Sequence, residues 1–136
     1  MIISPWDSGT RLYEGALDVR SSVHETIAAN LANEETPGYK ARHLPFKETL
    51  ASVLSGHFPL EPARTHPHHL PLVEGSDRIF EHSTVDNSGS GPDGNTVHLE
   101  KEMTLMAENT LYFMAVSQFL GGRFDGWRAA INEGRG

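Results

Sequence analysis

The 136-residue chain contains no cysteine. This absence excludes a disulfide framework, a thiol nucleophile and a thiolate metal site. It also favours a chain that must cross an oxidising compartment without pairing wrongly.

Positive charge is scarce as well. Eleven Lys and Arg residues stand against 18 Asp and Glu residues, which gives a formal net charge of -7, and no dense basic block occurs. A surface that binds nucleic acid needs clustered Lys and Arg to neutralise phosphates. We therefore expect no nucleic acid partner.

Long apolar runs are also missing. A helix that crosses a bilayer needs roughly 20 apolar residues in succession, and no segment approaches that length. The opening "MIISPWDSG" has neither a basic start nor the apolar core of a secretory signal. The sequence predicts neither a transmembrane helix nor a cleaved signal peptide, and no direct lipid binding.

The first third of the chain carries the signals of an amphipathic helix. Ser4 is the predicted N-cap, Pro5 the first helical residue, and Asp7 completes a variant of the capping box. Gly9 and Gly15 each cost roughly 1 kcal/mol relative to alanine, so this helix needs packing to be stable. Its apolar row recurs at helical spacing and consists of Leu12, Ala16, Val19, Val23, Ile27 and Leu31.

The last third has the strongest periodicity, with alternating steps of four and three residues that are typical of a coiled coil or bundle. The predicted helix runs from about Thr96 to Asn132. Gly121, Gly122 and Gly126 indicate either a kink or a close approach by another backbone. The row consists of Leu99, Met103, Met106, Thr110, Phe113, Ser117, Leu120, Phe124, Trp127 and Ile131.

Between these helices the pattern weakens. "FKETLASVL", from Phe46 to Leu54, predicts a short helix that lies on the first one. From Gly56 to Asn95 the chain is rich in Pro, Gly, His and Ser, which favours loop, with one short strand near Arg78 to Val85. We expect residues 1–42 and 96–136 to form a helical domain together, and residues 43–95 to form a loop-rich central segment.

These patterns predict a mainly α fold, in which long N- and C-terminal helices pack as an antiparallel, coiled-coil-like hairpin around a largely irregular middle. Each apolar row is wider than one partner helix can cover. The exposed remainder favours assembly into an oligomer.

The stretch "ANLANEETPGYKAR", residues 29–42, ends the first helix. Asn33 can adopt the left-handed conformation that closes a helix, and the segment from Thr36 to Tyr39 fits a type II turn with Gly38 at its third position. Asn30 lies beside the apolar row, so its amide needs a hydrogen-bond partner. We expect it either to hold the backbone of this corner or to fix register against another subunit.

This stretch resembles the signature N-x-A-N-x-x-T-P-G-Y-K of flagellar rod and hook proteins. "ARHLPFKETL" and "GNTVHLEKEM" resemble one branch of that class, the proximal basal-body rod proteins of the FlgB family. The resemblance covers about the first 50 and the last 45 residues. His98 stands where the family usually has an acidic residue, so we expect Asn95 to be the helix cap. The matching residues are Asn30, Ala32, Asn33, Thr36, Pro37, Gly38, Tyr39 and Lys40.

The resemblance implies a structural subunit that is exported by the flagellar type III apparatus and polymerises into the drive shaft of the basal body. Its implied partners are further copies of itself, other rod proteins, the membrane-ring protein, the rod-base adaptor and the export apparatus. It implies no catalytic residue and no cofactor. The predicted assembly row consists of Leu12, Val19, Val23, Ile27, Leu99, Met103, Met106, Phe113, Leu120, Phe124, Trp127 and Ile131.

Two alternatives stay open at this stage. His66, His68 and His69, with His57, Glu81, His82 and Asp86 nearby, carry donors for zinc or nickel, which favours a small metal-binding protein or a metal-dependent enzyme. No fixed ligand spacing such as H-E-x-x-H accompanies them, and no G-x-S-x-G motif predicts a nucleophile. The other alternative is a helical binding module that never polymerises.

Overall fold

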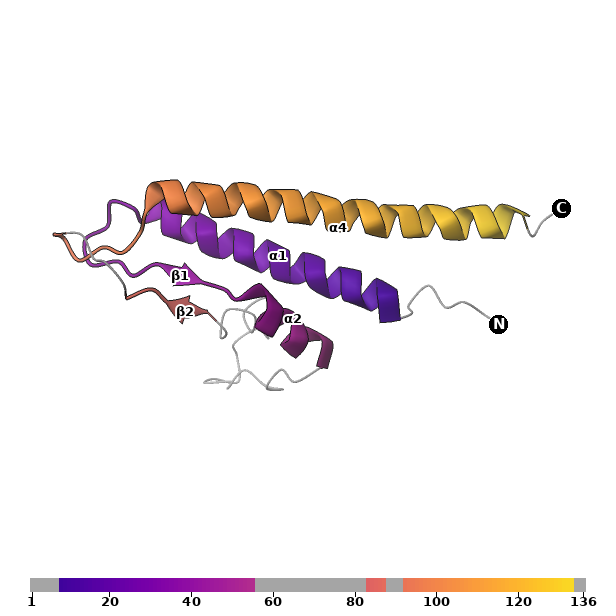
Figure 1. Cartoon of the computed structure of the whole chain (residues 1–136), viewed down its shortest axis with the longest axis horizontal. Coiled ribbons are helices and arrows are strands. Elements are labelled where there is room, and N and C mark those ends of the chain that lie inside the picture. Colours follow the sequence, from indigo (N-terminus) through magenta and orange to yellow (C-terminus); the bar gives the residue numbers. More distant parts are fainter. Residues whose placement is uncertain (1–7, 56–82, 88–91, 134–136) are drawn as a thin grey trace, which may run out of the picture.

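The computed structural model describes residues 8–55, 83–87 and 92–133. Along the chain it contains α1 (Ser8–Ala32), β1 (Arg42–His43), α2 (Phe46–Ser55), β2 (Thr84–Val85) and α4 (Leu99–Glu133) (Figure 1). The predicted cap at Ser4 lies outside the described residues. No helix in the described ranges is both long and apolar enough to span a membrane.

The two long helices form the predicted antiparallel hairpin. The start of α1 and the end of α4 lie at the same end of the molecule (Figure 1). Asn30 meets Glu102 near the corner, Tyr13 stacks on Phe119 further along, and Arg123 reaches Gly9 near the first described turn of α1. The helix α4 then continues to Glu133, beyond the start of α1. The predicted fold class is confirmed.

The helix α1 lies between α4 and α2 (Figure 1). The predicted short helix over residues 46–54 is therefore confirmed, and so is its position against the first helix. Gly15 permits the close approach, because a Cβ atom there would lie 3.2 Å from Cγ1 of Val53 and 3.6 Å from Cδ1 of Leu50. The buried apolar side chains are Ala16, Val19, Ile27, Ala41 and Leu44.

The strands β1 and β2 pair antiparallel, with Arg42 opposite Val85 and His43 opposite Thr84. The strand β2 falls inside the predicted range of Arg78 to Val85, of which residues 78–82 lie outside the described residues. The strand β1 was not predicted. Two residues are too few to show the alternating pattern by which a strand is recognised.

The row of α4 that contacts α1 is not the predicted apolar row. The contacting row precedes the predicted one by one residue throughout, which turns it by about 100° around the helix axis. The predicted row therefore lies beside the contact between the two helices. The α4 residues with contacts to α1 are Glu102, Asn109, Tyr112, Phe119 and Arg123.

Two local predictions were wrong. The helix α4 begins at Leu99 instead of Thr96, and the amide of Glu102 donates to the carbonyl of His98, so Asn95 is not the cap. Asn33 is not left-handed, because within the described ranges only Gly38 and Gly94 have positive φ. At Gly121 and Gly122, where the sequence left a kink or a close backbone approach open, α4 continues as one helix.

Candidate assembly surface

Asn30 closes the corner between the long helices. Its Nδ2 donates to the carbonyl of Arg42 at 2.7 Å and to Oε2 of Glu102 at 3.1 Å. Its Oδ1 accepts from the amide of Arg42 at 3.0 Å and from the hydroxyl of Tyr39 at 3.5 Å. The residue is fully buried, and these four contacts use the capacity of its amide. Of the two predicted roles, Asn30 therefore fills the first and holds the corner backbone.

The side chain of Asn33 makes two hydrogen bonds on the exposed side of the same corner. Its Nδ2 donates to the carbonyl of Ala29 at 2.8 Å, and its Oδ1 accepts from Oγ1 of Thr36 at 3.3 Å. The predicted type II turn follows, because the amide of Tyr39 donates to the carbonyl of Thr36 at 3.2 Å and Gly38 has a φ of 73°. The turn prediction is confirmed.

The segment just before α4 binds to this turn. Asn95 is buried, and its Nδ2 lies 2.9, 2.6 and 2.9 Å from the carbonyl oxygens of Asn33, Glu34 and Thr36. One amide group therefore reaches three carbonyls of the turn that follows α1. Nζ of Lys40 donates to the carbonyl of Gly94 at 2.8 Å, which adds a second link. The corner is thus built from both halves of the chain.

Thr96 extends the same connection toward the strands. Its hydroxyl accepts from the amide of Ala41 at 2.9 Å and donates to the carbonyl of Asp86 at 3.0 Å. The amide of Asp86 in turn donates to the carbonyl of Ala41 at 2.8 Å. The threonine therefore joins the segment before α4 to the residue that precedes β1 and the residue that follows β2.

Glu102 is an acidic side chain in the interior, with 1% of its surface exposed. Besides Asn30, its carboxylate faces Nε2 of His43 at 3.7 Å, and Asp86 lies at 3.7 Å from the same nitrogen. Nζ of Lys101 contacts Asp86 at 3.3 Å. A buried carboxylate needs such partners, because water does not solvate it. The first turn of α4 is fixed to β1 and β2 by this cluster.

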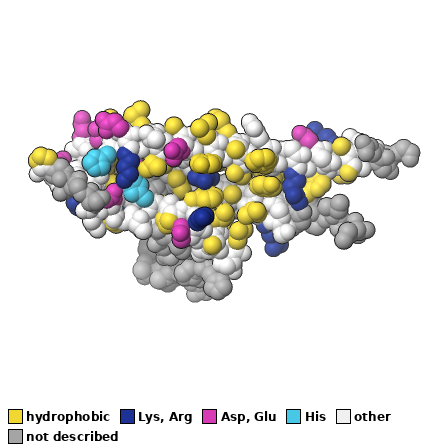
Figure 2. Space-filling view, in the orientation of Figure 1, with side chains coloured by type: hydrophobic (Ala, Val, Ile, Leu, Met, Phe, Trp, Pro, Cys, Tyr) yellow, Lys and Arg dark blue, Asp and Glu magenta, His cyan; other side chains and the backbone are white. Residues whose placement is uncertain are grey.

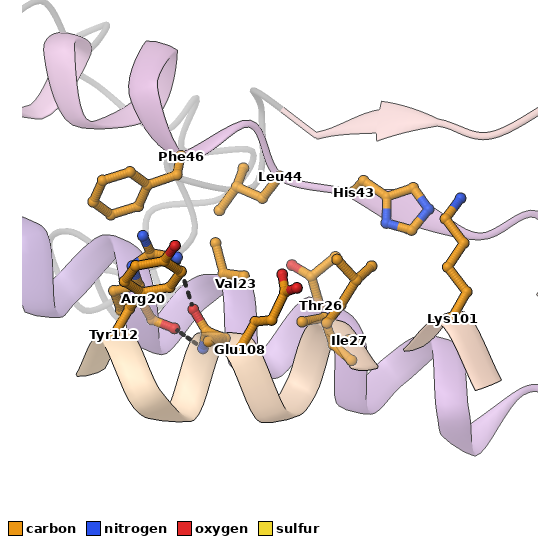
Figure 3. A pocket seen from close by; sticks show the side chains of 12 residues that line it. Arg20, Val23, Thr26, Ile27, His43, Leu44, Phe46, Lys101, Glu108 and Tyr112 are labelled. Carbon is orange, nitrogen blue, oxygen red and sulfur yellow. Dashed lines mark hydrogen bonds between the residues drawn. The ribbon is translucent and has the colours of Figure 1, made fainter. Parts of the chain in front are cut away.

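Arg20 lies at the centre of the hairpin, in a groove of about 350 Å³ between α1, α2 and α4. Figure 3 shows its guanidinium between the rings of Phe46 and Tyr112, whose centroids lie 3.8 and 4.5 Å from Cζ. Nη1 donates to Oδ1 of Asn109 at 3.3 Å, and Nδ2 of Asn109 donates back to the carbonyl of Arg20 at 2.9 Å. Burial lowers the pKa of Arg20, and the charge of Tyr112 opposes that shift. The guanidinium of Arg20, on α1, therefore contacts residues of both α2 and α4.

The part of the predicted assembly row on α1 is divided between the core and the surface. Val19 and Ile27 are buried inside the single chain, and Val23 is half-buried in the groove. Leu12 is exposed. The α1 side chains that form the hairpin core are therefore already covered within one subunit.

The part on α4 is mostly uncovered. Met103 is 58% exposed and Phe113 is 40% exposed, although α1 packs against the neighbouring row. Figure 2 shows apolar side chains gathered along the middle of the molecule. Met106, Leu120 and Trp127 are half-buried. The exposed apolar side chains of the predicted row on α4 are Leu99, Met103, Phe113, Phe124 and Ile131.

Comparison with known proteins identifies the family. No protein-family model matches the chain. The flagellar basal body rod protein FlgB of Salmonella typhimurium is 31% identical over 134 residues, which cover 94% of this chain and 96% of that protein. This chain belongs to the FlgB family. The FlgB protein of Escherichia coli is 29% identical with the same coverage, and that of Bacillus subtilis is 30% identical over 90% of this chain and 92% of its own length.

Membership in the FlgB family places the chain among the structural proteins of the flagellar basal-body rod. The signature that carried the resemblance is the corner built on Asn30 and on the turn from Thr36 to Tyr39. Ala32 and Pro37 are exposed in it, so their side chains do not contribute to the core. Among the signature residues, Asn30, Asn33 and Lys40 make side-chain hydrogen bonds within the corner.

The histidines behind the metal-binding alternative, His66, His68 and His69, lie outside the described residues, as do His57, Glu81 and His82. Asp86 is described and contacts His43 and Lys101. Among residues 8–55, 83–87 and 92–133, no group of three His, Cys, Asp or Glu side chains is arranged to hold a metal ion.

Two polar residues that hold α4 to α1 in this FlgB chain were missed from the sequence. Glu102 and Asn109 were not singled out as contacts, because single polar residues on an amphipathic helix usually face solvent. The feature of the sequence that could have identified both residues is their spacing along α4. Both follow the alternating steps of three and four on α4, one residue before the apolar row.

Proposed function

We propose that this chain is a structural subunit of the proximal flagellar rod, and that the predicted row on α4 packs against neighbouring subunits. Family membership supports the first part. One observation carries the second: Leu99, Met103 and Phe113 are exposed in the single chain, beside a row that contacts α1 and in which Tyr112 and Phe119 are exposed as well. The proposed interface consists of those residues of the predicted assembly row on α4 that the single chain leaves exposed.

Burial of the exposed row of α4 by a neighbouring subunit lowers the free energy. Burying a large apolar side chain is worth about 1.5–3 kcal/mol relative to leaving it in water. Several such side chains along one helix form a surface typical of protein interfaces. Phe124 and Ile131 extend the exposed row toward the end of α4. Sister subunits and other rod proteins are the partners we propose for it.

The corner suits a part that carries mechanical load. Asn30, Asn95 and Glu102 join the end of α1, the turn and the start of α4 through buried and partly buried hydrogen bonds. In our proposal torque passes through this fixed geometry and through packed side chains, with no bound ligand or catalytic step. The helical part, residues 1–42 and 96–136, forms the shaft, and the membrane-ring protein and rod-base adaptor lie at its base.

We also propose that the subunit leaves the cytoplasm through the flagellar type III apparatus without cleavage. A deletion of the gene tests the whole function. Deleted cells should not swim and should have no rod beyond the membrane ring, while the restored gene returns both. Motile deletants with intact basal bodies would reject the proposal.

A charge on the exposed row tests the proposed interface. Phe113→Asp should block rod assembly and swimming, because a carboxylate cannot be buried between subunits without a partner. Gln118→Asp is the matched control, since Gln118 is exposed on the same helix away from the row. Export and circular dichroism should be unchanged in both variants. If Phe113→Asp restores swimming to deleted cells, this row is not the interface.

A further inference from the structure

The exposed row of α4 needs a surface of a different shape to pack against. A contact between two copies of the same surface closes into a dimer, whereas an open shaft requires two different surfaces on each subunit. The row on α4, which ends with Phe124, Trp127 and Ile131, supplies one of them. The other surface should be a concave, apolar part of the same chain.

The groove between α1, α2 and α4 has these properties. Its volume is about 350 Å³, and Tyr112 in its wall is exposed although Arg20 lies against one face of the ring. Aromatic side chains and arginine are also the residues that carry much of the binding energy at protein interfaces. The apolar side chains of the lining are Val23, Ile27, Leu44, Phe46, Leu105 and Tyr112.

The groove and the exposed row face different directions. Lys101 and Glu108 line the groove, and Met106 and Phe113 of the predicted row follow them by five positions. Five residues turn an α-helix by about 140°. One neighbouring copy can therefore cover the row while another occupies the groove.

Glu108 gives the groove a negative charge that the single chain does not use. Figure 3 shows its side chain directed into the groove. The lysine and the arginine of the lining already have partners, because Arg20 bonds to Asn109 and Lys101 contacts Asp86. Within the part of the chain that the structure describes, no hydrogen bond or ion pair involves the carboxylate of Glu108. This carboxylate can accept a cation from another molecule.

The end of the exposed row carries the matching charge. Arg128 follows Phe124 by four positions and precedes Ile131 by three, so the three side chains share one side of α4. Arg128 is exposed, and no acidic side chain in the described ranges pairs with it. Arg128 and Glu108 lie about 30 Å apart along one helix, at 1.5 Å per residue, so they cannot pair within one chain.

We propose that the groove receives the end of α4 from a second copy of this chain, with Phe124 and Ile131 against the apolar lining and Arg128 paired with Glu108. The apolar side chains supply the buried surface. The charge pair selects the segment of the row that enters the groove, because complementary charges fix register at an interface. This inference rests on the proposed function, since it names the surface that the assembly row meets.

Reversal of the two charges tests the pair in cells that lack the parent gene. Glu108→Arg and Arg128→Glu should each reduce the diameter of swimming rings to less than about half, because each brings two like charges together. Both changes in one chain should restore swimming. Arg128→Glu with Asp18→Arg is the matched control, because it has the same net charge but Asp18 is exposed on α1 outside the groove. Single variants that swim like the parent, a double variant that does not recover, or a control that recovers equally would overturn the proposal.

Cysteine cross-linking tests the contact without relying on swimming, since the chain has no cysteine of its own. Glu108→Cys/Arg128→Cys, expressed in the same cells and oxidised, should give linked dimers and longer chains on a non-reducing gel, and neither single variant should. Dimers of a single variant would show contact between identical surfaces, and a double variant without linked products would show no contact. Either result would overturn the proposal. Linked chains in cells that swim without the gene would contradict the proposed function and still support the contact.

Discussion

The side-chain nitrogen of Asn30, Nδ2, lies 3.1 Å from the carboxylate of Glu102, a residue 72 positions later in the chain. The bond joins the end of α1 to the first turn of α4, and both side chains are buried. The same amide group also pairs with both backbone polar groups of Arg42. One side chain therefore holds together three segments.

Replacing Asn30 should destabilise the subunit. Asn30→Ala leaves the carboxylate of Glu102 and the backbone of Arg42 short of partners in the interior, where each such loss costs about 1–3 kcal/mol. We expect the free energy of unfolding to fall by about 2–4 kcal/mol. Urea denaturation followed by circular dichroism measures this change.

The second asparagine of the signature is the control. Asn33 makes an exposed hydrogen bond to Ala29, which water can replace. Asn33→Ala should therefore lower the free energy of unfolding by only about 0.5–1 kcal/mol. Equal losses in the two variants would contradict the assignment of the corner to Asn30.

The stacked cation at the centre of the hairpin gives a second prediction. Arg20→Lys keeps the charge but loses the planar group that lies between Phe46 and Tyr112 and bonds to Asn109. The free energy of unfolding should fall by about 1–2 kcal/mol. Arg11→Lys, on the exposed side of α1, should change it by less than about 0.5 kcal/mol. The geometry of Arg20 would have no energetic role if both variants matched the parent.

The central histidines give a third prediction. Calorimetric titration of zinc into the full chain should produce only weak heat without a defined stoichiometry, because no fixed ligand spacing surrounds His66, His68 and His69. Saturation at one ion per chain, lost in His68→Ala, would instead favour the metal-binding alternative.

The helices and the turn could be predicted because their causes are local. Apolar spacing marks α1, α2 and α4, and the dipeptide Pro37-Gly38 fixes the type II turn. The contacting row of α4 could not be predicted in the same way. It includes Glu102 and Asn109, whose partners lie on α1, so hydrophobicity pointed to the adjacent row instead.

The role of Asn95 could not be predicted from the sequence for the same reason. An asparagine shortly before a helix is typical of an N-cap, and the sequence supported that interpretation. In the structure its Nδ2 reaches carbonyls of Asn33, Glu34 and Thr36, about 60 residues earlier in the chain. A local pattern cannot indicate a partner that tertiary contact brings close.

Two helical glycines should respond oppositely to substitution. Gly121 faces open space within the described residues, so Gly121→Ala should raise the free energy of unfolding of the isolated chain by about 0.5–1 kcal/mol through helix propensity alone. Gly15 faces Val53 and Leu50 of α2, and Gly15→Leu should lower that free energy by about 1–3 kcal/mol, because the larger side chain forces the helices apart. Thermal and urea denaturation of both variants measure the difference. A stabilising Gly15→Leu would mean that α2 does not pack on α1 in solution.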